Sequence, residues 1–390
     1  MSGPLTGIRV VEFTHMVMGP VVGHVLASLG ADVVRVEPIG GDRTRRLVGS
    51  GAGYFPMFNR GKQSICLDLK GDKGLQAALD LVSRADVLVE NYRPGALDRL
   101  GLGWETLRHD NPGLIYCSEK GFLPGPYENR TALDEVAQMM GGLAYMTGPP
   151  GRPLRAGSSV IDIAGGMFGV IGILAALEER HRTGRGQKVV ASLFETTAYL
   201  VGQHMAQFAV TGTPAAPMPA RVSAWAVYDV FETQDEPLFI GVVTDALWEK
   251  FCLLFGLDDL WADLSLRENN ARVAARGQIL PPIRAMIARM TREEVIAKLE
   301  GTGLPFAPIN RPEDLFTDPH LAAGGLEEVR LPDGADVRLP RLPLEVGGCR
   351  PADAGDLPRP GADTREVLRT LGYTDERIDE LLELGQGEQS

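Results

Sequence analysis

The sequence has few of the residues that form disulfides or hold a metal ion. Its 390 residues include four cysteines, Cys66, Cys117, Cys252 and Cys349, none of them in a C-x-x-C pair. The six histidines form no H-x-x-x-H or H-E-x-x-H pair. Disulfide-rich domains and zinc sites depend on such spacings. The sequence therefore indicates neither, and we expect no metal.

Positive charge and long apolar runs are also scarce. The 39 lysines and arginines are outnumbered by 51 acidic residues, which gives a net charge of −12 and argues against a nucleic-acid surface. The N-terminus, MSGPLTGIRVVEF, lacks a basic segment followed by an apolar signal core. The longest uncharged apolar stretch, residues 163–177, is shorter than the ~20 residues that cross a bilayer. We expect a cytoplasmic protein that binds neither nucleic acid nor membrane.

The length predicts one large and one smaller domain. Residues 1–210 would form the large domain, and residues 211–223, which include TGTPAAPMP, would be a linker. Residues 224–308 begin with strand-like runs and turn helical, as in a small α+β domain. Residues 309–390 are rich in proline and glycine, and we expect an extended strap whose final helices return to the large domain.

The large domain begins with a strand, helix, strand pattern over residues 8–13, 20–29 and 32–37. The alternation continues, with strands expected at residues 64–69, 86–91, 114–118 and 189–192 and a helix at 74–84. This pattern predicts a Rossmann-like α/β domain with a parallel sheet. The first turn contains only Gly19 and Gly23 instead of G-x-G-x-x-G, which argues against NAD binding.

In open α/β sheets, ligands lie beyond the carboxyl ends of the strands. We therefore expect a pocket walled by the turn at His15 and by loops 40–61 and 91–101. Basic residues in these loops suit an anionic, phosphate-bearing ligand, although solvated loops also carry arginines. They are Arg43, Arg45, Arg46, Arg60, Lys62, Arg93 and Arg99.

One acidic side chain, Asp162, stands at the start of an otherwise apolar helix. Residues 163–177 carry no charge and show no polar stripe, so we expect this helix to be buried on nearly all sides. Its glycines recur three and four residues apart and predict a smooth face for another backbone; they are Gly165, Gly166, Gly169 and Gly172. At a helix start, free N–H groups and the dipole favour an ionised carboxylate. These residues alone indicate an ordinary N-cap, with catalysis as the alternative.

Seven segments, in order and with matching spacing, resemble the class III CoA-transferase family, which includes formyl-CoA transferase, carnitine CoA-transferase and bile-acid-inducible protein F. They are VVEFTHMVMGP with LGADVVRVE, FNRGKQSICLDLK, ADVLVENYRPGALDRLGLGWE, NPGLIYCSEKGF, LDEVAQMMGG, AALEERHRTGRGQKV and GLPFAPINRPEDLFTDPH. The resemblance implies a Rossmann-type large domain, a small domain and a homodimer of two chains interlocked like linked rings.

The resemblance also implies site residues. The catalytic aspartate of the family matches Asp162 in VIDIAGGMFG, and an acidic active-site neighbour matches Asp134 in LDEVAQ. The contacts with coenzyme A match His15, Asn91, Tyr92 and Arg99.

The expected chemistry moves coenzyme A from an acyl-CoA to a free carboxylic acid. The Asp162 carboxylate would form a mixed anhydride with the acyl group and then an aspartyl-CoA thioester, so the activation of the thioester is kept. N–H groups at Gly165 and Gly166 would stabilise the oxyanions. For a dicarboxylic acid, Arg45 or Arg60 would hold the second carboxylate.

Two alternatives stay open. A 2-methylacyl-CoA racemase of the same family is the first, but the racemases have a histidine where this chain has Leu133, so one of two acid/base groups is missing. A non-catalytic CoA- or NAD-binding Rossmann protein is the second. Between Pro219 and Trp248 the chain has only Gly241, so it lacks the glycine run of formyl-CoA transferase, and formyl-CoA with oxalate is not the expected pair.

Overall fold

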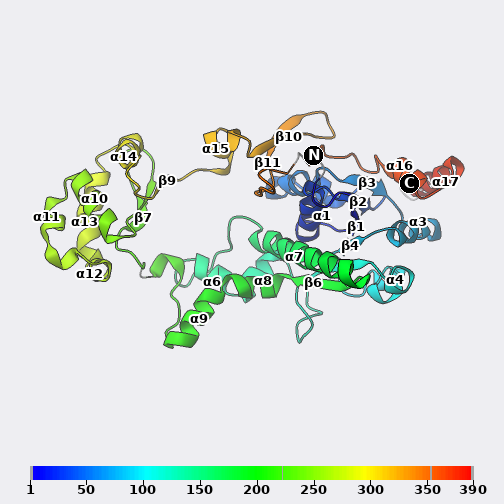
Figure 1. The fold of residues 1–390 in the computed structure, drawn as a ribbon, viewed down its shortest axis with the longest axis horizontal. Helices are drawn as coiled ribbons and strands as arrows, with labels where there is room; N and C mark the ends of the chain where they lie inside the picture. The colour runs from blue at the N-terminus through cyan, green and yellow to red at the C-terminus, as the bar shows by residue number, and fades with distance from the viewer. Residues whose placement is uncertain (1–2, 222, 352–353, 388–390) are drawn as a thin grey trace. The chain divides into compact units, whose positions relative to one another are not determined.

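The computed structural model describes residues 3–221, 223–351 and 354–387. Residue 222 of the predicted linker, residues 352–353 and 388–390 of the predicted strap, and residues 1–2 lie outside the described residues. The chain forms two compact units (Figure 1). Unit 1 comprises Met1–Pro219 and Pro319–Ser390, and unit 2 comprises Ala220–Asp318.

Unit 1 is built on a six-stranded parallel sheet in the order β3-β2-β1-β4-β5-β6, which confirms the predicted parallel sheet. Its strands are β1 (Arg9–Phe13), β2 (Asp32–Glu37), β3 (Gln63–Cys66), β4 (Val87–Glu90), β5 (Ile115–Lys120) and β6 (Lys188–Ser192). The central strands are rich in valine and buried on both faces, as parallel strands covered by helices are. The strand order reverses between β1 and β4, which is where such sheets open a ligand crevice.

Helices cover both faces of this sheet. On one face, β1 and its neighbours pack against α1 (Met18–Ser28) and α7 (Val160–Thr183). On the other face lie α3 (Asp72–Ser83), α4 (Trp104–Asp110) and the C-terminal helices. Unit 1 also contains α2 (Tyr54–Asn59), α5 (Asp134–Met140), α6 (Leu143–Thr147), α8 (Leu193–Leu200), α9 (Gly202–Thr211) and the 3-10 turns η1 (Arg43–Arg46), η2 (Gly49–Gly53) and η3 (Asp98–Leu100).

Helix α7 approaches α1 through its glycines. A Cβ at Gly166 would lie 2.6 Å from the Met18 carbonyl oxygen, and one at Gly165 would lie 2.6 Å from the Met18 methyl group. The predicted smooth face is therefore confirmed. The prediction of burial on nearly all sides is wrong, because an outer stripe remains exposed, with Met167 at 43%, Ile171 at 59% and Leu174 at 38%.

The length of α7 also differs from the expectation. Among the described residues, α7 is the one helix long and apolar enough, by length and composition, to cross a membrane. The statement that no stretch is long enough is therefore wrong. Core helices of soluble proteins pass the same test, and α7 packs against both α1 and the sheet.

The C-terminal part of unit 1 is more structured than the expected strap. It contains α15 (Pro319–Ala322), a hairpin of β10 (Leu326–Arg330) and β11 (Asp336–Pro340), α16 (Thr364–Thr370) and α17 (Asp375–Gly387). The hairpin was not predicted. The tail is tied to the sheet where the Ser64 N–H donates to the Asp363 carboxylate at 2.7 Å, and to α3 where the Tyr373 hydroxyl donates to Asp80 at 2.6 Å.

Unit 2 has an antiparallel sheet of β7 (Tyr228–Phe231), β8 (Leu238–Gly241) and β9 (Phe306–Pro308). Its helices are α10 (Asp245–Phe255), α11 (Asp258–Ala262), α12 (Asn269–Ala274), α13 (Arg276–Ile287) and α14 (Arg292–Leu299), with η5 (Leu264–Leu266) and η6 (Pro312–Phe316). The chain leaves the helical conformation between Ile287, the last residue of α13, and Arg292, the first residue of α14. A capping box of Thr291 and Glu294 starts α14 there.

Candidate active site

A pocket of about 230 Å³ lies at the carboxyl edge of the sheet, beside the reversal in strand order. It brings together four of the six predicted site residues, His15, Asn91, Asp134 and Asp162. Tyr54, from loop 40–61, also lines it, so the three expected walls all contribute. Further walls, which were not predicted, come from the end of β5, from Ala132 and Glu135 beside the predicted Asp134, and from Leu193.

The Asn91 side chain fixes the backbone of His15. Its Oδ1 accepts a hydrogen bond from the His15 N–H at 2.9 Å, and its Nδ2 donates to the His15 carbonyl at 2.8 Å. The Tyr92 ring lies 5.5 Å from the imidazole, centroid to centroid. Burial lowers the pKa of His15, and its buried Nδ1 has no partner within the described residues. His15 therefore presents a neutral imidazole.

The residue after His15 is conformationally strained. Met16 has φ of 61°, and among the described residues it is the one non-glycine residue with a positive φ. Its N–H donates to the Thr44 hydroxyl at 3.3 Å, which ties this turn to η1. Strain of this kind persists where the surroundings hold the backbone firmly, often beside a functional site.

Asp134 caps the helix that carries Asp162. Its Oδ2 accepts hydrogen bonds from the Ile161 N–H at 2.9 Å and from the Asp162 N–H at 3.2 Å. The other oxygen of Asp134 accepts from Gln138 at 2.5 Å. Ser159, at the N-cap position, makes no side-chain cap. Interpreting Asp162 as an ordinary N-cap is therefore wrong, because a residue of α5 supplies the cap.

The Asp162 carboxylate has no hydrogen-bond donor within the described part of the chain. Burial, together with the negative charges of Asp134 and Glu135, raises its pKa to about 7, and Arg155 opposes this only partly. The expectation that the helix start favours the ionised form is therefore wrong, since the free N–H groups bond to Asp134 instead. A poorly solvated carboxylate of raised basicity is a stronger nucleophile than one in water.

Glu119 is a pocket residue that the sequence did not reveal. It is 2% exposed and lies in β5, next to the last residue of that strand. Burial, and the nearby charge of Glu90, raise its pKa to about 8, although a hydrogen bond from Cys117 opposes this. The rule that ligands meet the carboxyl ends of strands was the available signal.

The basic residues predicted for ligand binding have other roles. Arg45 pairs with Glu37 at 2.6 Å and Lys62 with Glu12 at 2.8 Å, while buried Arg60 pairs with Glu327. These three are engaged in ion pairs, so the expectation that Arg45 or Arg60 holds a second carboxylate is wrong. The exposed members of the set are Arg43, Arg46, Arg93 and Arg99. Neither Tyr92 nor Arg99 lines the pocket.

Two further expectations concern the same pocket. Gly165 and Gly166 lie inside α7, where backbone N–H groups bond within the helix, so they are not the predicted oxyanion donors. Leu133 lines the pocket and is 58% exposed, so an apolar side chain stands where the racemases have an imidazole.

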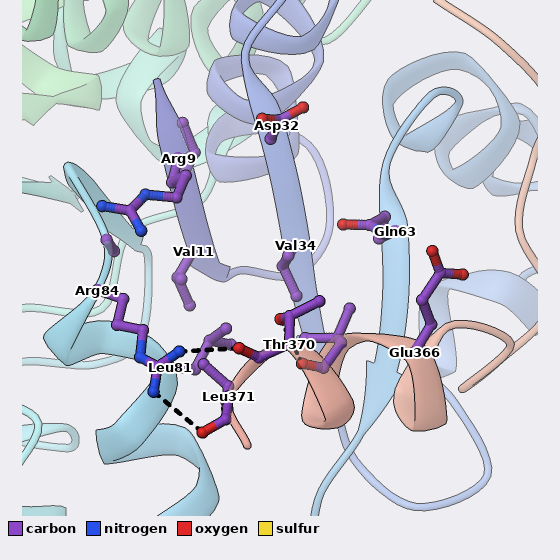
Figure 2. Close-up of a pocket in the computed structure, with 13 residues that line it drawn as sticks. Arg9, Val11, Asp32, Val34, Gln63, Leu81, Arg84, Glu366, Thr370 and Leu371 are labelled. Atoms are coloured by element: carbon purple, nitrogen blue, oxygen red, sulfur yellow. Dashed lines mark hydrogen bonds between the residues drawn. The ribbon is translucent and has the colours of Figure 1, made fainter. Parts of the chain in front are cut away.

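A larger pocket, of about 330 Å³, lies at the other end of the strands, where the parallel strands begin (Figure 2). Arg9, Asp32 and Gln63, the first residues of β1, β2 and β3, contribute to it. Arg84 closes one side by donating to the Thr370 and Leu371 carbonyls at 2.8 and 3.0 Å. It is a packing gap between the sheet, α3 and α16, on the edge where such sheets do not bind ligands. The residues that the structure describes include no cluster of three or more His, Cys, Asp or Glu that could hold a metal ion.

Several known proteins are similar to this chain in sequence or in structure. A sequence profile described as CoA-transferase family III matches residues 5–364. The chain is 32% identical to the succinyl-CoA:glutarate CoA-transferase of Mus musculus, over 99% of this chain and 91% of that protein. It is 34% identical to the formyl-CoA:oxalate CoA-transferase of Rhodopseudomonas palustris, over 99% and 97%. A crystal structure of a CaiB/BaiF family protein from Brucella suis matches with a TM-score of 0.85 and 33% identity, over 95% of this chain and 100% of that one.

Proposed function

This chain belongs to CoA-transferase family III and is a CoA-transferase, and we propose that Asp162 is its nucleophile. One observation supports the assignment above all. Asp162 stands half-buried in the pocket with no hydrogen bond to its carboxylate among the described residues, and its pKa is raised to about 7. Near neutral pH it therefore supplies a basic, weakly solvated carboxylate.

The proposed reaction has four balanced steps. An Asp162 oxygen attacks the thioester carbon, and the C–S bond breaks to give a mixed anhydride and CoA thiolate. The thiolate attacks the Asp162 carbonyl, which releases the donor acid and forms an aspartyl-CoA thioester. The acceptor carboxylate displaces the thiolate, and the thiolate then takes the new acyl group and frees Asp162. No proton is gained or lost, so the reaction requires no acid/base pair.

The size of the pocket suits an acyl group and not a whole coenzyme. At about 230 Å³ it falls below the ~300–1,000 Å³ of sites that enclose complete ligands. We propose that the acyl group and thioester occupy it, while the nucleotide lies outside along the loops that follow β1 and β4. His15, Asn91, Tyr92 and Arg99 remain the proposed coenzyme A contacts.

We propose a dicarboxylic acid as one of the acids exchanged. The mouse relative is named for glutarate and the Rhodopseudomonas relative for oxalate, both dicarboxylates. The missing glycine run between Pro219 and Trp248 argues against formyl-CoA with oxalate for this chain. Racemisation is the second candidate, because the proposed pocket would hold an acyl-CoA in either case. The absence of an imidazole at Leu133 disfavours it, and deuterium uptake at Cα of a 2-methylacyl-CoA would support it.

We propose that the enzyme is an interlocked homodimer. Exposed apolar side chains on α7, α8 and α9 support this, with Ile171 at 59%, Tyr199 at 73% and Phe208 at 52% exposed. Such a surface on one chain is typical of a protein interface. A dimer that persists at nanomolar concentration in sedimentation is the expected result, and a folded monomer there would contradict the proposal.

The nucleophile is tested by mass spectrometry of the protein. Incubation with an acyl-CoA donor alone should add the mass of a CoA adduct, and hydroxylamine should convert Asp162 to a hydroxamate. Asp162→Asn should fold and lose both the adduct and turnover. A hydroxamate mapped to Asp134 or Glu119, which also line the pocket, would place the nucleophile elsewhere.

A further inference from the structure

Glu119 and Cys117 project from the same face of β5, toward α7. The Cys117 thiol donates to Glu119 Oε1 at 3.3 Å. A Cβ at Gly169 would lie 1.9 Å from that oxygen, so the missing side chain of Gly169 makes room for the carboxyl group. Glu119 is thus built into the wall between β5 and α7.

The second oxygen of Glu119 lacks a partner. Oε2 is buried and forms no hydrogen bond within the described residues. Lys120, the neighbouring cation, instead donates to Glu90 at 2.9 Å and to the Tyr92 carbonyl at 2.7 Å. The titratable groups that act on Glu119 are Cys117 and Lys120 of β5, Glu90 of β4 and Asp162 of α7. No cation in the described part of the chain bonds to the Glu119 carboxyl, so the buried group is held in its neutral form.

A neutral carboxyl is a hydrogen-bond donor. Because Oε1 already accepts from Cys117, Oε2 is the oxygen that carries the proton. An oxygen atom of a bound molecule would supply the acceptor that the described residues do not. Glu119 lines the same pocket as Asp162, and it is more deeply buried than Asp162.

The spacing along α7 indicates the size of that molecule. Glu119 packs against Gly169 of α7. Asp162 precedes Gly169 by seven residues on the same face of the helix, which corresponds to about 10 Å along the helix axis. A reacting carbon stands about 3 Å from its nucleophile, and a hydrogen-bonded oxygen about 3 Å from its donor. About 4–5 Å remains, the length of roughly three C–C bonds.

We propose that Glu119 determines acyl specificity: its neutral carboxyl donates a hydrogen bond to the distal carboxylate of a four- or five-carbon dicarboxylic acyl group attached to coenzyme A. This inference rests on the proposed role of Asp162. In this inference Glu119 binds the distal end of the acyl group and takes no part in bond making or breaking.

The test compares two thioesters that differ only at the far end of the acyl group. Succinyl-CoA ends in a carboxylate and butyryl-CoA in a methyl group, and the CoA adduct on the protein is followed with either donor alone. In the wild type, the second-order rate constant for adduct formation should be at least about tenfold higher with succinyl-CoA than with butyryl-CoA. Glu119→Leu, which keeps the volume, should remove this preference by slowing only succinyl-CoA. Glu119→Gln, which keeps a donor, should retain most of it.

If Glu119→Leu does not fold, the pH dependence of the thioester preference tests the inference instead. Above pH 8 the wild-type preference should decline, because an ionised Glu119 repels the distal carboxylate, whereas Glu119→Gln should show no such decline. Equal slowing of both donors by Glu119→Leu, or a Gln variant with the pH dependence of the wild type, would overturn the inference. A wild-type adduct formed equally from both thioesters would overturn it and leave the role of Asp162 intact. A wild type that forms no adduct with acetyl-, butyryl- or succinyl-CoA would refute the proposed role of Asp162 as the nucleophile.

Discussion

The carboxylate of Asp134 accepts the backbone N–H of Asp162 at 3.2 Å, so one acidic residue caps the helix on which the other stands. The cap satisfies the N–H groups of Ile161 and Asp162 at the start of α7, and the Asp162 side chain has no hydrogen bond within the described residues. It also places a second negative charge beside Asp162, which adds to burial in raising its pKa. The pKa of Asp162 is therefore raised, although a helix start ordinarily lowers the pKa of a carboxyl group.

Replacing Asp134 by asparagine should separate these two effects. The amide oxygen of the Asp134→Asn variant can still cap α7, but the charge is gone, so the pKa of Asp162 should fall from about 7. The rising limb of kcat/KM against pH should move to lower pH. Asp134→Ala, the matched control, should move it similarly and also cost about 1 kcal/mol of stability. A limb that stays near pH 7 in both variants would mean that Asp134 does not control Asp162.

Asp162→Asn should stabilise the enzyme at pH 8 and have little effect at pH 4. A carboxyl whose pKa is raised from 3.8 to about 7 on folding binds its proton more tightly in the native state. Stability is therefore lost as pH rises from about 4 to 7, and the asparagine variant avoids that loss. The gain at pH 8 should be of order 4 kcal/mol, since each unit by which folding raises the pKa corresponds to about 1.4 kcal/mol, and thermal unfolding at both pH values measures it. A variant that is less stable at pH 8 would show that the ionised carboxylate is favoured in the fold.

The sheet was predictable because its signal is local. Valine-rich runs between turn residues locate the strands, and β2 has the predicted bounds, Asp32–Glu37. The β10–β11 hairpin was missed because its residues stand among prolines and glycines that suggest an extended strap. It is stabilised by distant contacts, such as Val329 with Phe55.

Residues of the site could be predicted only where they belong to a sequence motif of the family. His15, Asn91, Asp134 and Asp162 came from the resemblance, and the fold brings all four to one pocket. The loop arginines misled because their partners are set by tertiary structure, as for Arg60, whose partner Glu327 is 267 residues away. The cap from Asp134 to Asp162 also spans 28 residues and follows no local pattern.

Asn91→Ala should weaken acyl-CoA binding by loosening the turn at His15. The side chain makes both hydrogen bonds that hold the His15 backbone, and their loss should raise KM about tenfold with a smaller effect on kcat. Asn111→Ala is the control, because Asn111 also bonds a backbone carbonyl, that of Ala85 at 2.8 Å, but does not line the pocket. Both variants should lose similar stability. If Asn111→Ala raises KM as much, the effect of Asn91 is one of stability alone.

Gly169→Ala should destabilise the enzyme although alanine favours a helix by about 0.5–1 kcal/mol. The new Cβ would lie 1.9 Å from Glu119 Oε1 and 3.3 Å from Val22. The Glu119 carboxyl cannot move into solvent, because β5 and α7 enclose it, so the clash should outweigh the helix preference by about 1–3 kcal/mol. The matched control is Gly277→Ala in α13, where a Cβ meets nothing within 4 Å and should stabilise the helix.

Calorimetry measures the change in unfolding free energy of Gly169→Ala and of Gly277→Ala. A double variant that also carries Glu119→Ala then tests whether the clash is with Glu119. Glu119→Ala removes the carboxyl group that Gly169→Ala would strike, so the double variant should be more stable than the sum of the single effects predicts. The same carboxyl group is the proposed reader of the far end of the acyl group. Gly169→Ala should therefore also reduce the preference for succinyl-CoA over butyryl-CoA, while Gly277→Ala should not. A Gly169→Ala enzyme as stable as the Gly277→Ala enzyme, with an unchanged thioester preference, would show that Glu119 is free to move away from α7.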